Sequence, residues 1–585
     1  MLTCCHWVEE SLLSTSMDNR HQVLTALLES CWDHFYPYLL NEDIGKIDSA
    51  LTEKSLRELY FKQVSKFYLK NCVRMAAELA WIMKRDIDLT VCRLDFDHNP
   101  NATHQGITHL LTNLPNTAFN SLFINIVGYL YTDIFSNIFI RYTSLSEIRA
   151  PSVYNLGRLS IPPISEQIYP NLQVIDFTSG TLTGEEVLKL CQRCPNLQSL
   201  SLGLARLSFT NKSVQSLVKY CPNLHNLVLI GGFLSALTLT YLTQLIHLTT
   251  LDLSTYNMFT TIEIQTFIKG HIGTNLEVLK IGITDTNYST VLQSISTYCP
   301  IIRELSCRKD EYNVELVVYT PDEAVLSFIR SCPCLEVLDI ADYSPTDAVL
   351  CTIAECCPLF KYTVLNGSNK TYSNLGLIAL SRGCPQVTQL LINNNTITDA
   401  AIVSFAEHCH ELEFIQIINN DIISSHSLCD LLSVNPGLTR IRLGDCDGLN
   451  DSVMYTISQY CPKLTDLILH DCIHYTEDAL ITLITHCHML KELYLENSSV
   501  SLTFIDILTR QCKHLRTIRL KNCLNFTLQC IILLLKHSKH LIYIEGTDCG
   551  VVFTEVVYAQ LTSIRRPDYS RVVVQSDMGV GDKIF

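Results

Sequence analysis

Apolar and polar residues alternate along the chain in a pattern that returns at regular intervals. In Leu200-Ser-Leu202 the period is two, so both leucines face one side of an extended strand and Ser201 faces the other. About eight residues later the apolar spacing changes to three and four, as in Val214, Leu217 and Val218. The pattern therefore predicts a short strand followed by a helix.

The same short sequence motif precedes many of these strands. Cys194-Pro-Asn-Leu197-Gln-Ser-Leu200 returns as Cys221-Pro-Asn-Leu224-His-Asn-Leu227 and as Cys461-Pro-Lys-Leu464-Thr-Asp-Leu467. Later markers of this phase stand at positions 384, 409, 435, 461, 487, 512 and 538, with spacings of 25, 26, 26, 26, 25 and 26 residues. Degenerate copies extend the array from Leu94 to Ile544, which gives about eighteen repeats of about 26 residues.

A strand and a helix within about 26 residues are the unit of a leucine-rich repeat. One such unit cannot bury its apolar face alone, so neighbouring units stack. The predicted fold is an α/β leucine-rich-repeat solenoid in the form of a horseshoe, with a parallel sheet on the concave face and helices on the convex face. We expect the solenoid to span residues 86–546, with a C-terminal cap and a loose tail over 547–585.

Many of the 26 cysteines fall at two phases of the repeat. Some end the helices, where a small apolar residue fits under the turn: Cys194, Cys221, Cys461 and Cys487. Others stand three residues after the second strand leucine, where a cysteine or asparagine bonds the neighbouring loop: Cys446, Cys472, Cys523, Asn395 and Asn420. The array resembles the cysteine-containing subfamily of leucine-rich repeats, the type found in F-box proteins and their relatives.

Charge and composition narrow the function classes. The net charge of −15 disfavours nucleic acid and anionic membranes as partners, because both require a basic surface. The first twenty residues have no basic segment followed by an apolar run, so they predict no signal peptide. We therefore expect an intracellular protein, cytoplasmic or nuclear, with reduced thiols, that is a monomer outside its complex.

Two clusters have the residue types of a metal site, His408-Cys409-His410 and His486-Cys487-His488. In each, the cysteine occupies the buried helix-end phase, and structural zinc usually needs two spaced pairs of ligands. We predict no metal. The sequence also has no glycine-rich phosphate loop, nucleophile elbow or zinc-protease helix, so we predict no catalytic residues.

Residues 31–85 break the 26-residue period and follow residues 1–30, a helical or loose N-terminal segment. Spacings of three and four predict short helices as far as Tyr68. The run Phe35-Tyr-Pro-Tyr-Leu39, followed by Asp43-Ile44 and Ile47, is similar to the F-box pattern. The resemblance implies docking of an adaptor of a cullin-type ubiquitin ligase through Trp32, Phe35, Leu39, Leu40, Ile44 and Ile47. The alternative is a helical cap, which the exposed end of a solenoid requires in any case.

Between the inward leucines lie the residues expected on the concave face. In the late repeats they form a patch about 15 Å across, which suits a protein surface. We predict that it binds a target protein through Arg442, Ile468, His470, Tyr494, Glu496, Arg519 and Lys521. Plant hormone receptors of the F-box type hold an inositol phosphate with a concentrated ring of basic residues. Here the basic positions are scattered, so we predict no cofactor.

Together these observations predict a non-catalytic, substrate-recognition subunit of a ubiquitin ligase. The alternative is a protein-binding scaffold with no ubiquitin link, whose N-terminal segment is only a cap.

Overall fold

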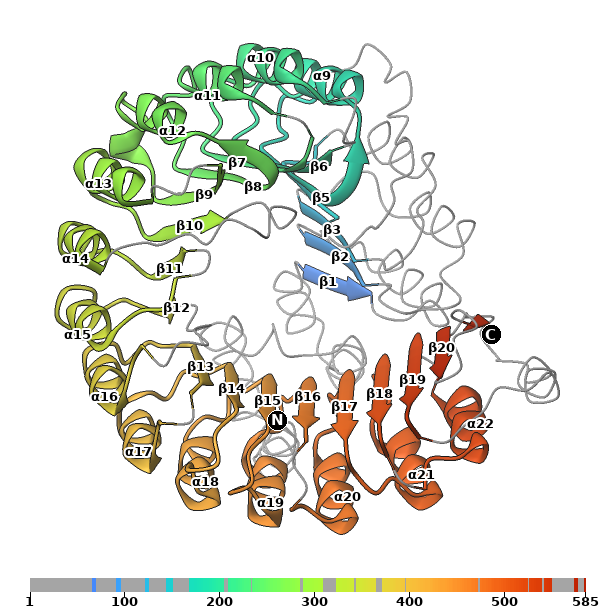
Figure 1. Cartoon of the computed structure of the whole chain (residues 1–585). Helices are drawn as coiled ribbons and strands as arrows, with labels where there is room; N and C mark the ends of the chain where they lie inside the picture. The colour runs from blue at the N-terminus through green and yellow to red at the C-terminus, as the bar shows by residue number, and fades with distance from the viewer. Residues whose placement is uncertain are drawn as a thin grey trace, which may run out of the picture. The chain divides into compact units, whose positions relative to one another are not determined.

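The computed structural model describes residues 66–69, 91–95, 121–125, 144–150, 168–204, 209–232, 234–284, 288–308, 322–340, 343–363, 371–394, 396–471, 474–523, 525–538, 541–549, 573–576 and 583–584. The chain divides into two compact units, Met1–Leu224 and His225–Phe585. From Val174 to Thr547 the described strands and helices alternate along the chain, as the repeat pattern predicts (Figure 1).

The first unit contains a parallel sheet whose strands pair in chain order. Its described strands are β1 (Lys66–Leu69), β2 (Val91–Asp95), β3 (Ser121–Asn125), β4 (Glu147–Arg149), β5 (Val174–Leu182) and β6 (Ser199–Leu204). Helix α9 (Gly184–Arg193) follows β5, and α10 (Asn211–Tyr220) follows β6. Thr183 and Glu186 form a capping box at the start of α9, which supplies partners for backbone N–H groups of the first turn.

The second unit begins with another series of strand–helix repeats. Its first strands are β7 (Asn226–Gly231), β8 (Thr250–Phe259), β9 (Val278–Ile283), β10 (Glu304–Arg308), β11 (Val337–Ile340) and β12 (Tyr362–Thr363), each pairing in parallel with the next. The accompanying helices are α11 (Ala236–Leu242), α12 (Thr261–Ile268), the short 3₁₀ helix η3 (Gly273–Asn275), α13 (Tyr288–Tyr298), α14 (Asp322–Ser331) and α15 (Asp347–Cys356).

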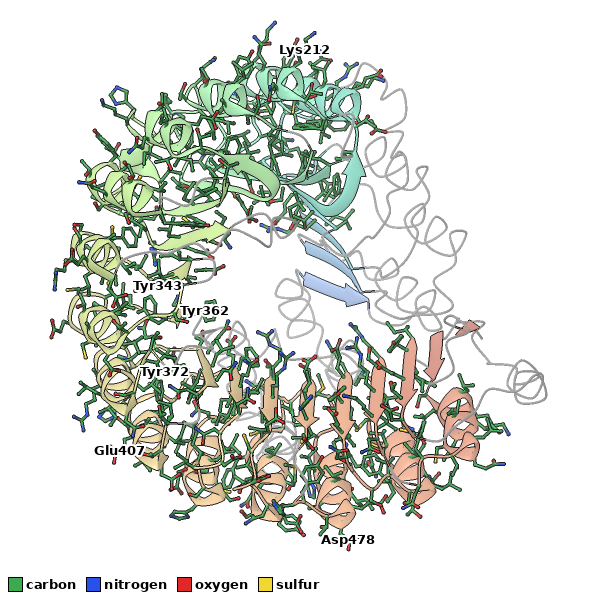
Figure 2. All side chains as sticks on the ribbon, viewed as in Figure 1. Lys212, Tyr343, Tyr362, Tyr372, Glu407 and Asp478 are labelled. Carbon is green, nitrogen blue, oxygen red and sulfur yellow. The ribbon has the colours of Figure 1, made fainter. Side chains whose placement is uncertain are left out.

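A second sheet of this unit carries the late repeats. Its strands are β13 (Gln389–Asn393), β14 (Phe414–Ile418), β15 (Arg440–Gly444), β16 (Asp466–His470), β17 (Glu492–Glu496), β18 (Thr517–Lys521), β19 (Tyr543–Thr547), β20 (Val573–Ser576) and β21 (Lys583–Ile584). The helices are α16 (Asn374–Gly383), α17 (Asp399–His408), α18 (Ser425–Ser433), α19 (Asp451–Tyr460), α20 (Glu477–His486), α21 (Leu502–Gln511) and α22 (Leu528–His537). In this unit Figure 2 shows Glu407 and Asp478 on the helix side and Tyr362 and Tyr372 on the strand side.

The core lies between the strands and helices of each repeat. In β15 to β18 the second strand leucine is 0 % exposed in every repeat, at Leu443, Leu469, Leu495 and Leu520. These leucines pair directly across the sheet, so a one-residue slip would move the whole row to the solvent face. The inward leucines predicted from the period of two are therefore confirmed.

The helix-end cysteines form a hydrogen-bonded ladder through successive repeats. The thiol of Cys384 donates to the carbonyl oxygen of Cys357 at 3.3 Å, and the thiol of Cys409 donates to that of Cys384 at 3.8 Å. Further along, Cys512 donates to the carbonyl oxygen of Cys487 at 3.6 Å. These side chains are small enough for the buried site, and each thiol adds a second donor to a carbonyl oxygen that already accepts a backbone N–H just past a helix end.

A second series of hydrogen bonds follows the strands, in which an asparagine or cysteine side chain bonds carbonyl oxygens of the preceding repeat. One of these side chains lies one residue from the predicted position. Asn420 donates to the carbonyl oxygens of Asn394 and Ile397 at 2.7 and 2.9 Å, as expected for that phase. In the preceding repeat it is the buried Asn394 that donates, to the carbonyl oxygen of Tyr372 at 2.8 Å. The predicted Asn395 lies outside the described residues. Cys446 and Cys523 bond carbonyl oxygens of the preceding repeat, as predicted.

The residue just before each of these asparagine and cysteine positions turns the chain sharply out of the strand. It adopts a left-handed backbone conformation with φ between 48° and 56° in six successive repeats, and in each it is an asparagine or aspartate: Asn419, Asp445, Asp471, Asn497, Asn522 and Asp548. Asparagine and aspartate tolerate this conformation better than other residues with a Cβ. A short polar residue at this place is therefore a local requirement of the turn.

Two expectations at the ends of the chain need revision. The helical pattern predicted up to Tyr68 is wrong at its end, because Lys66–Leu69 is strand β1 and pairs in parallel with β2. Near the C-terminus the strand-like run predicted over residues 571–574 overlaps β20, which pairs with β19, but the tail predicted to be loose, residues 575–583, begins within β20 and ends within β21, which pairs antiparallel with β20. The adaptor-docking residues Trp32, Phe35, Leu39, Leu40, Ile44 and Ile47 lie outside the described residues.

Candidate partner-binding face

The strand face of β15 to β19 brings the predicted target-binding residues together in two rows. Because these strands are parallel and in register, residues at the same position stand side by side on one face. The first row runs from Arg442 on β15 through Ile468, Tyr494 and Arg519 to Glu545 on β19. The second row contains His470, Glu496 and Lys521, two residues further along their strands.

Glu496 is the hub of the second row. Its Oε1 lies 2.8 Å from Nζ of Lys521, and its Oε2 lies 2.9 Å from Nε2 of His470. The hydroxyl of Tyr494 also donates to Oε2 at 2.9 Å. Glu496 is only 6 % exposed, although the period of two placed it on the outer face. It therefore organises the groups around it, and Tyr494, Lys521 and His470 present the accessible surface.

The electrostatics of this cluster follow from its contacts. Burial raises the pKa of Glu496, but hydrogen bonds from Lys521 and Tyr494 and the charge of His470 outweigh it and hold that pKa below its ordinary value. For Tyr494, burial and the adjacent Glu496 carboxylate both raise the pKa of the phenol. Glu496 is thus ionised at neutral pH, and Tyr494 keeps its proton as a hydrogen-bond donor. The Tyr494 ring also stacks on His470, with centroids 6.2 Å apart.

Arg519 belongs to a separate cluster on β18 and β19. Its Nε lies 3.7 Å from Oε2 of Glu545, and its guanidinium lies 5.4 Å from the centre of the Tyr543 ring. Thr547 donates to Oε1 of Glu545 at 2.9 Å. Tyr543 and Glu545 were not among the predicted binding residues. Glu545 stands opposite Arg519 in the strand register and Tyr543 stands opposite Thr517, so the period of two could have identified both.

The other end of the patch is basic. Arg442 is exposed and its Nη1 donates to Oε1 of Gln416 on β14 at 3.2 Å. Arg440, two residues earlier on the same face, is also exposed, and its guanidinium lies 4.6 Å from the centre of the Phe414 ring. Arg440 is a second residue that the sequence analysis left out, because it begins its strand.

The metal-like clusters have other roles in the described residues. The thiol of Cys409 is buried and donates to carbonyl oxygens, while Nδ1 of His408 lies 2.8 Å from the carbonyl oxygen of Ser404 on its own helix. His486 makes the same contact with Thr482. In the part of the chain that the structure describes, no group of three or more His, Cys, Asp or Glu side chains is placed to hold a metal ion.

None of the helices in the described ranges is both long enough and apolar enough to span a membrane.

The strand–helix units, the in-register leucines and the two series of hydrogen bonds define an α/β repeat protein of the leucine-rich-repeat type. No family model matches the chain. Among solved structures, the chain is similar to one in a crystal structure of a yeast complex of Rad7 and Elc1, at 15 % identity and a TM-score of 0.31, over 87 % of this chain and 93 % of that chain. It is also similar to one in a crystal structure of a TLR13–ssRNA13 complex, at 15 % identity and a TM-score of 0.35, over 75 % of this chain and 72 % of that one.

Proposed function

We propose that this protein is a non-catalytic binding subunit that holds a target protein on the strand face of β15 to β18. The row of Arg442, Ile468, Tyr494 and Arg519 is the observation that carries the proposal. It combines aromatic, apolar and guanidinium side chains on paired strands, and Tyr and Arg are enriched among residues that dominate protein interfaces. A rigid sheet also lowers the entropy lost on binding.

The finer proposal is that the target is presented to a cullin-type ubiquitin ligase. It rests on the sequence of the N-terminal segment, where Phe35, Leu39, Ile44 and Ile47 follow an F-box-like pattern. In this arrangement the segment docks the ligase adaptor through its apolar residues, and the strand face captures the target. The protein then acts without chemistry of its own, by raising the effective concentration of the target near the ligase.

A scaffold without a ubiquitin link is the second candidate. Strand β1 (Lys66–Leu69) lies within residues 31–85, after the F-box-like run, and stands at the end of the first unit's strand order. An end strand of a repeat array exposes backbone groups and apolar surface that need a cover. In this candidate the segment before β1 only supplies that cover.

Affinity purification of the intact chain and of the double variant Ile44→Asp plus Ile47→Asp separates the two candidates. A ligase subunit brings down an adaptor and a cullin with the intact chain and loses both with the double variant. Thermal unfolding of the variant checks that the repeats remain folded. If no adaptor or cullin accompanies the intact chain, the ligase proposal is wrong and the scaffold stands.

The strand face has its own test. Tyr494→Ala plus Arg519→Ala is compared with Tyr455→Ala plus Arg510→Ala, which removes the same two residue types from exposed sites on α19 and α21. Each interface hot spot contributes about 2 kcal/mol or more, which is about thirtyfold in affinity, so the first variant should weaken binding of the target protein by a factor of about thirty or more. Equal binding by both variants would remove the strand face from the proposal.

A further inference from the structure

Two arginines on β15 differ from the other basic groups of the strand face in having no ion-paired carboxylate within the described part of the chain. Arg440 and Arg442 are two residues apart on one strand, so their side chains leave the same face, about 7 Å apart at their origins. Both side chains are exposed. Among the described residues, no carboxylate forms an ion pair with either of them.

The neighbouring basic side chains described on β16 and β18 each lie against a carboxylate. Lys521 and His470 share the carboxylate of Glu496, and Arg519 lies 3.7 Å from Glu545. Asp466 stands directly across from Arg440 in the strand register, yet its carboxylate accepts a hydrogen bond from the Thr465 hydroxyl instead. In a chain with a net charge of −15, two adjacent arginines that form no ion pair with any carboxylate of the described residues are a specific local feature.

Strand β14 orients both guanidinium groups. Gln416 is 8 % exposed, and its side-chain oxygen accepts from Nη1 of Arg442. The half-buried ring of Phe414 lies under the guanidinium of Arg440 at 4.6 Å. Stacking and a hydrogen bond to a buried amide restrict the rotamers of long side chains, so less entropy is lost when an anion binds.

We propose that Arg440 and Arg442 bind a phosphorylated side chain of the target protein. This inference rests on the proposed function, since it names the chemical group of the target that the strand face recognises. Two guanidinium groups supply a charge of about +2, which matches the charge of about −1.5 to −2 on a phosphorylated serine, threonine or tyrosine near pH 7. The planar donors of arginine suit the phosphate oxygens, and clusters of arginine are a recurring means of phosphate recognition.

A single carboxylate fits the pair less well, because it would leave one guanidinium charge without compensation. The surroundings suit a peptide, since Ile468 stands beside Arg442 in the register and offers an apolar contact to a residue next to the phosphate.

The experiment measures binding of the full-length chain to three fluorescent nonapeptide libraries. They share random flanks and differ only at the centre, which is phosphoserine, serine or glutamate. The tested variant is Arg440→Gln plus Arg442→Gln. The control is Arg382→Gln plus Arg510→Gln, which makes the same change in charge at exposed sites on α16 and α21.

The phosphoserine library should bind the intact chain at least about tenfold more tightly than either of the other libraries. This preference should disappear in the β15 variant and persist in the control. The proposal is overturned if the phosphoserine library has no preference over serine, if glutamate binds equally well, or if the β15 variant keeps the preference while its thermal unfolding is unchanged.

Phosphatase treatment of the target distinguishes this inference from the function on which it rests. If the treatment and the β15 variant both abolish binding of the target, the inference stands. If binding depends on Tyr494 and Arg519 but survives phosphatase, the proposed face is correct and the phosphate inference is wrong. If neither treatment nor any variant of the face changes binding, both are wrong.

Discussion

Asn435 donates from its side-chain Nδ2 to the carbonyl oxygen of Cys409 at 3.1 Å, and thereby replaces a thiol in the helix-end ladder. It occupies the phase at which Cys384, Cys409 and Cys461 stand in other repeats. Its Nδ2 also donates to the carbonyl oxygen of Leu431 at 2.9 Å, and its Oδ1 accepts a hydrogen bond from the N–H of Leu412 at 3.0 Å. One asparagine thus pairs three backbone groups, and its own exposure is 0 %.

Asn435→Ala should destabilise the late repeats strongly. Each buried polar group left without a partner costs about 1–3 kcal/mol, so we expect a loss of a few kcal/mol in the free energy of unfolding. Asn435→Cys should lose clearly less, because a thiol at this phase can donate to Cys409 as Cys409 does to Cys384. Urea denaturation followed by circular dichroism measures both. Equal destabilisation by alanine and cysteine would show that the ladder bond contributes nothing.

The Glu496 cluster predicts a specific dependence of stability on pH. The pKa of Glu496 lies below its ordinary value of 4.5, because Lys521, Tyr494 and His470 favour its ionised form by more than burial opposes it. A carboxyl with a lowered pKa in the folded state stabilises that state above its unfolded pKa. This contribution is lost as the pH falls from about 4.5 through the lower folded value.

Glu496→Gln should therefore cost about 1.5–3 kcal/mol in the free energy of unfolding at pH 7, the range for a hydrogen bond to a charged group. The difference from the intact chain should shrink as the pH falls below 4.5. Urea denaturation between pH 7 and pH 3.5 measures it, with Glu411→Gln at an exposed position as the matched control. A difference that stays constant over this range would contradict the assignment of Glu496 as the ionised hub.

The thiols of the helix-end ladder should be unreactive in the folded chain. Burial raises the pKa of Cys384, Cys487 and Cys512 to about 12 in each case. The thiolate is the reactive form, so few of these side chains are ionised near pH 8. Iodoacetamide labelling followed by mass spectrometry should modify the half-buried Cys334 and Cys429 before Cys384, Cys487 and Cys512. Labelling of Cys384 at the rate of Cys429 in the native protein would contradict the ladder.

The leucine rows were predictable because the period of two is strict and each row fills one side of the strands. Leu469 and Leu495 are buried as that period requires. The burial of Glu496 could not be predicted in this way. Its three partners come from three different repeats, and their contacts depend on how far each side chain extends. The position of Asn394 was missed for a simpler reason. Its repeat is one residue shorter than the next, so counting three residues from Ile392, the second inward strand position, reaches Asn395 instead of Asn394.

Local spacing also gave a wrong prediction at β1, where it indicated a helix. Phe61, Val64 and Phe67 are three residues apart, which is typical of one face of a helix. Pairing with β2 instead makes a strand of Lys66–Leu69. Strand pairing depends on a partner distant in sequence, and a short window cannot detect it. The arrangement of Arg440 and Arg442 could not be predicted either, because their contacts with Phe414 and Gln416, and the lack of an ion-paired carboxylate among the described residues, depend on neighbouring strands.

Close packing of α15 on α16 should make Gly383 intolerant of any side chain. A Cβ atom at Gly383 would overlap the backbone oxygen, carbonyl carbon and Cα of Ala354, and none of these can move without the helix. Gly383→Ala should therefore cost about 1–3 kcal/mol in the free energy of unfolding, the usual range for overpacking. Gly437→Ala is the matched control, since its Cβ would meet only the carbonyl oxygen of Leu412 at 3.7 Å, an ordinary contact. Urea denaturation of both variants decides the point. If Gly383→Ala is as stable as Gly437→Ala, the two helices are further apart than the structure places them.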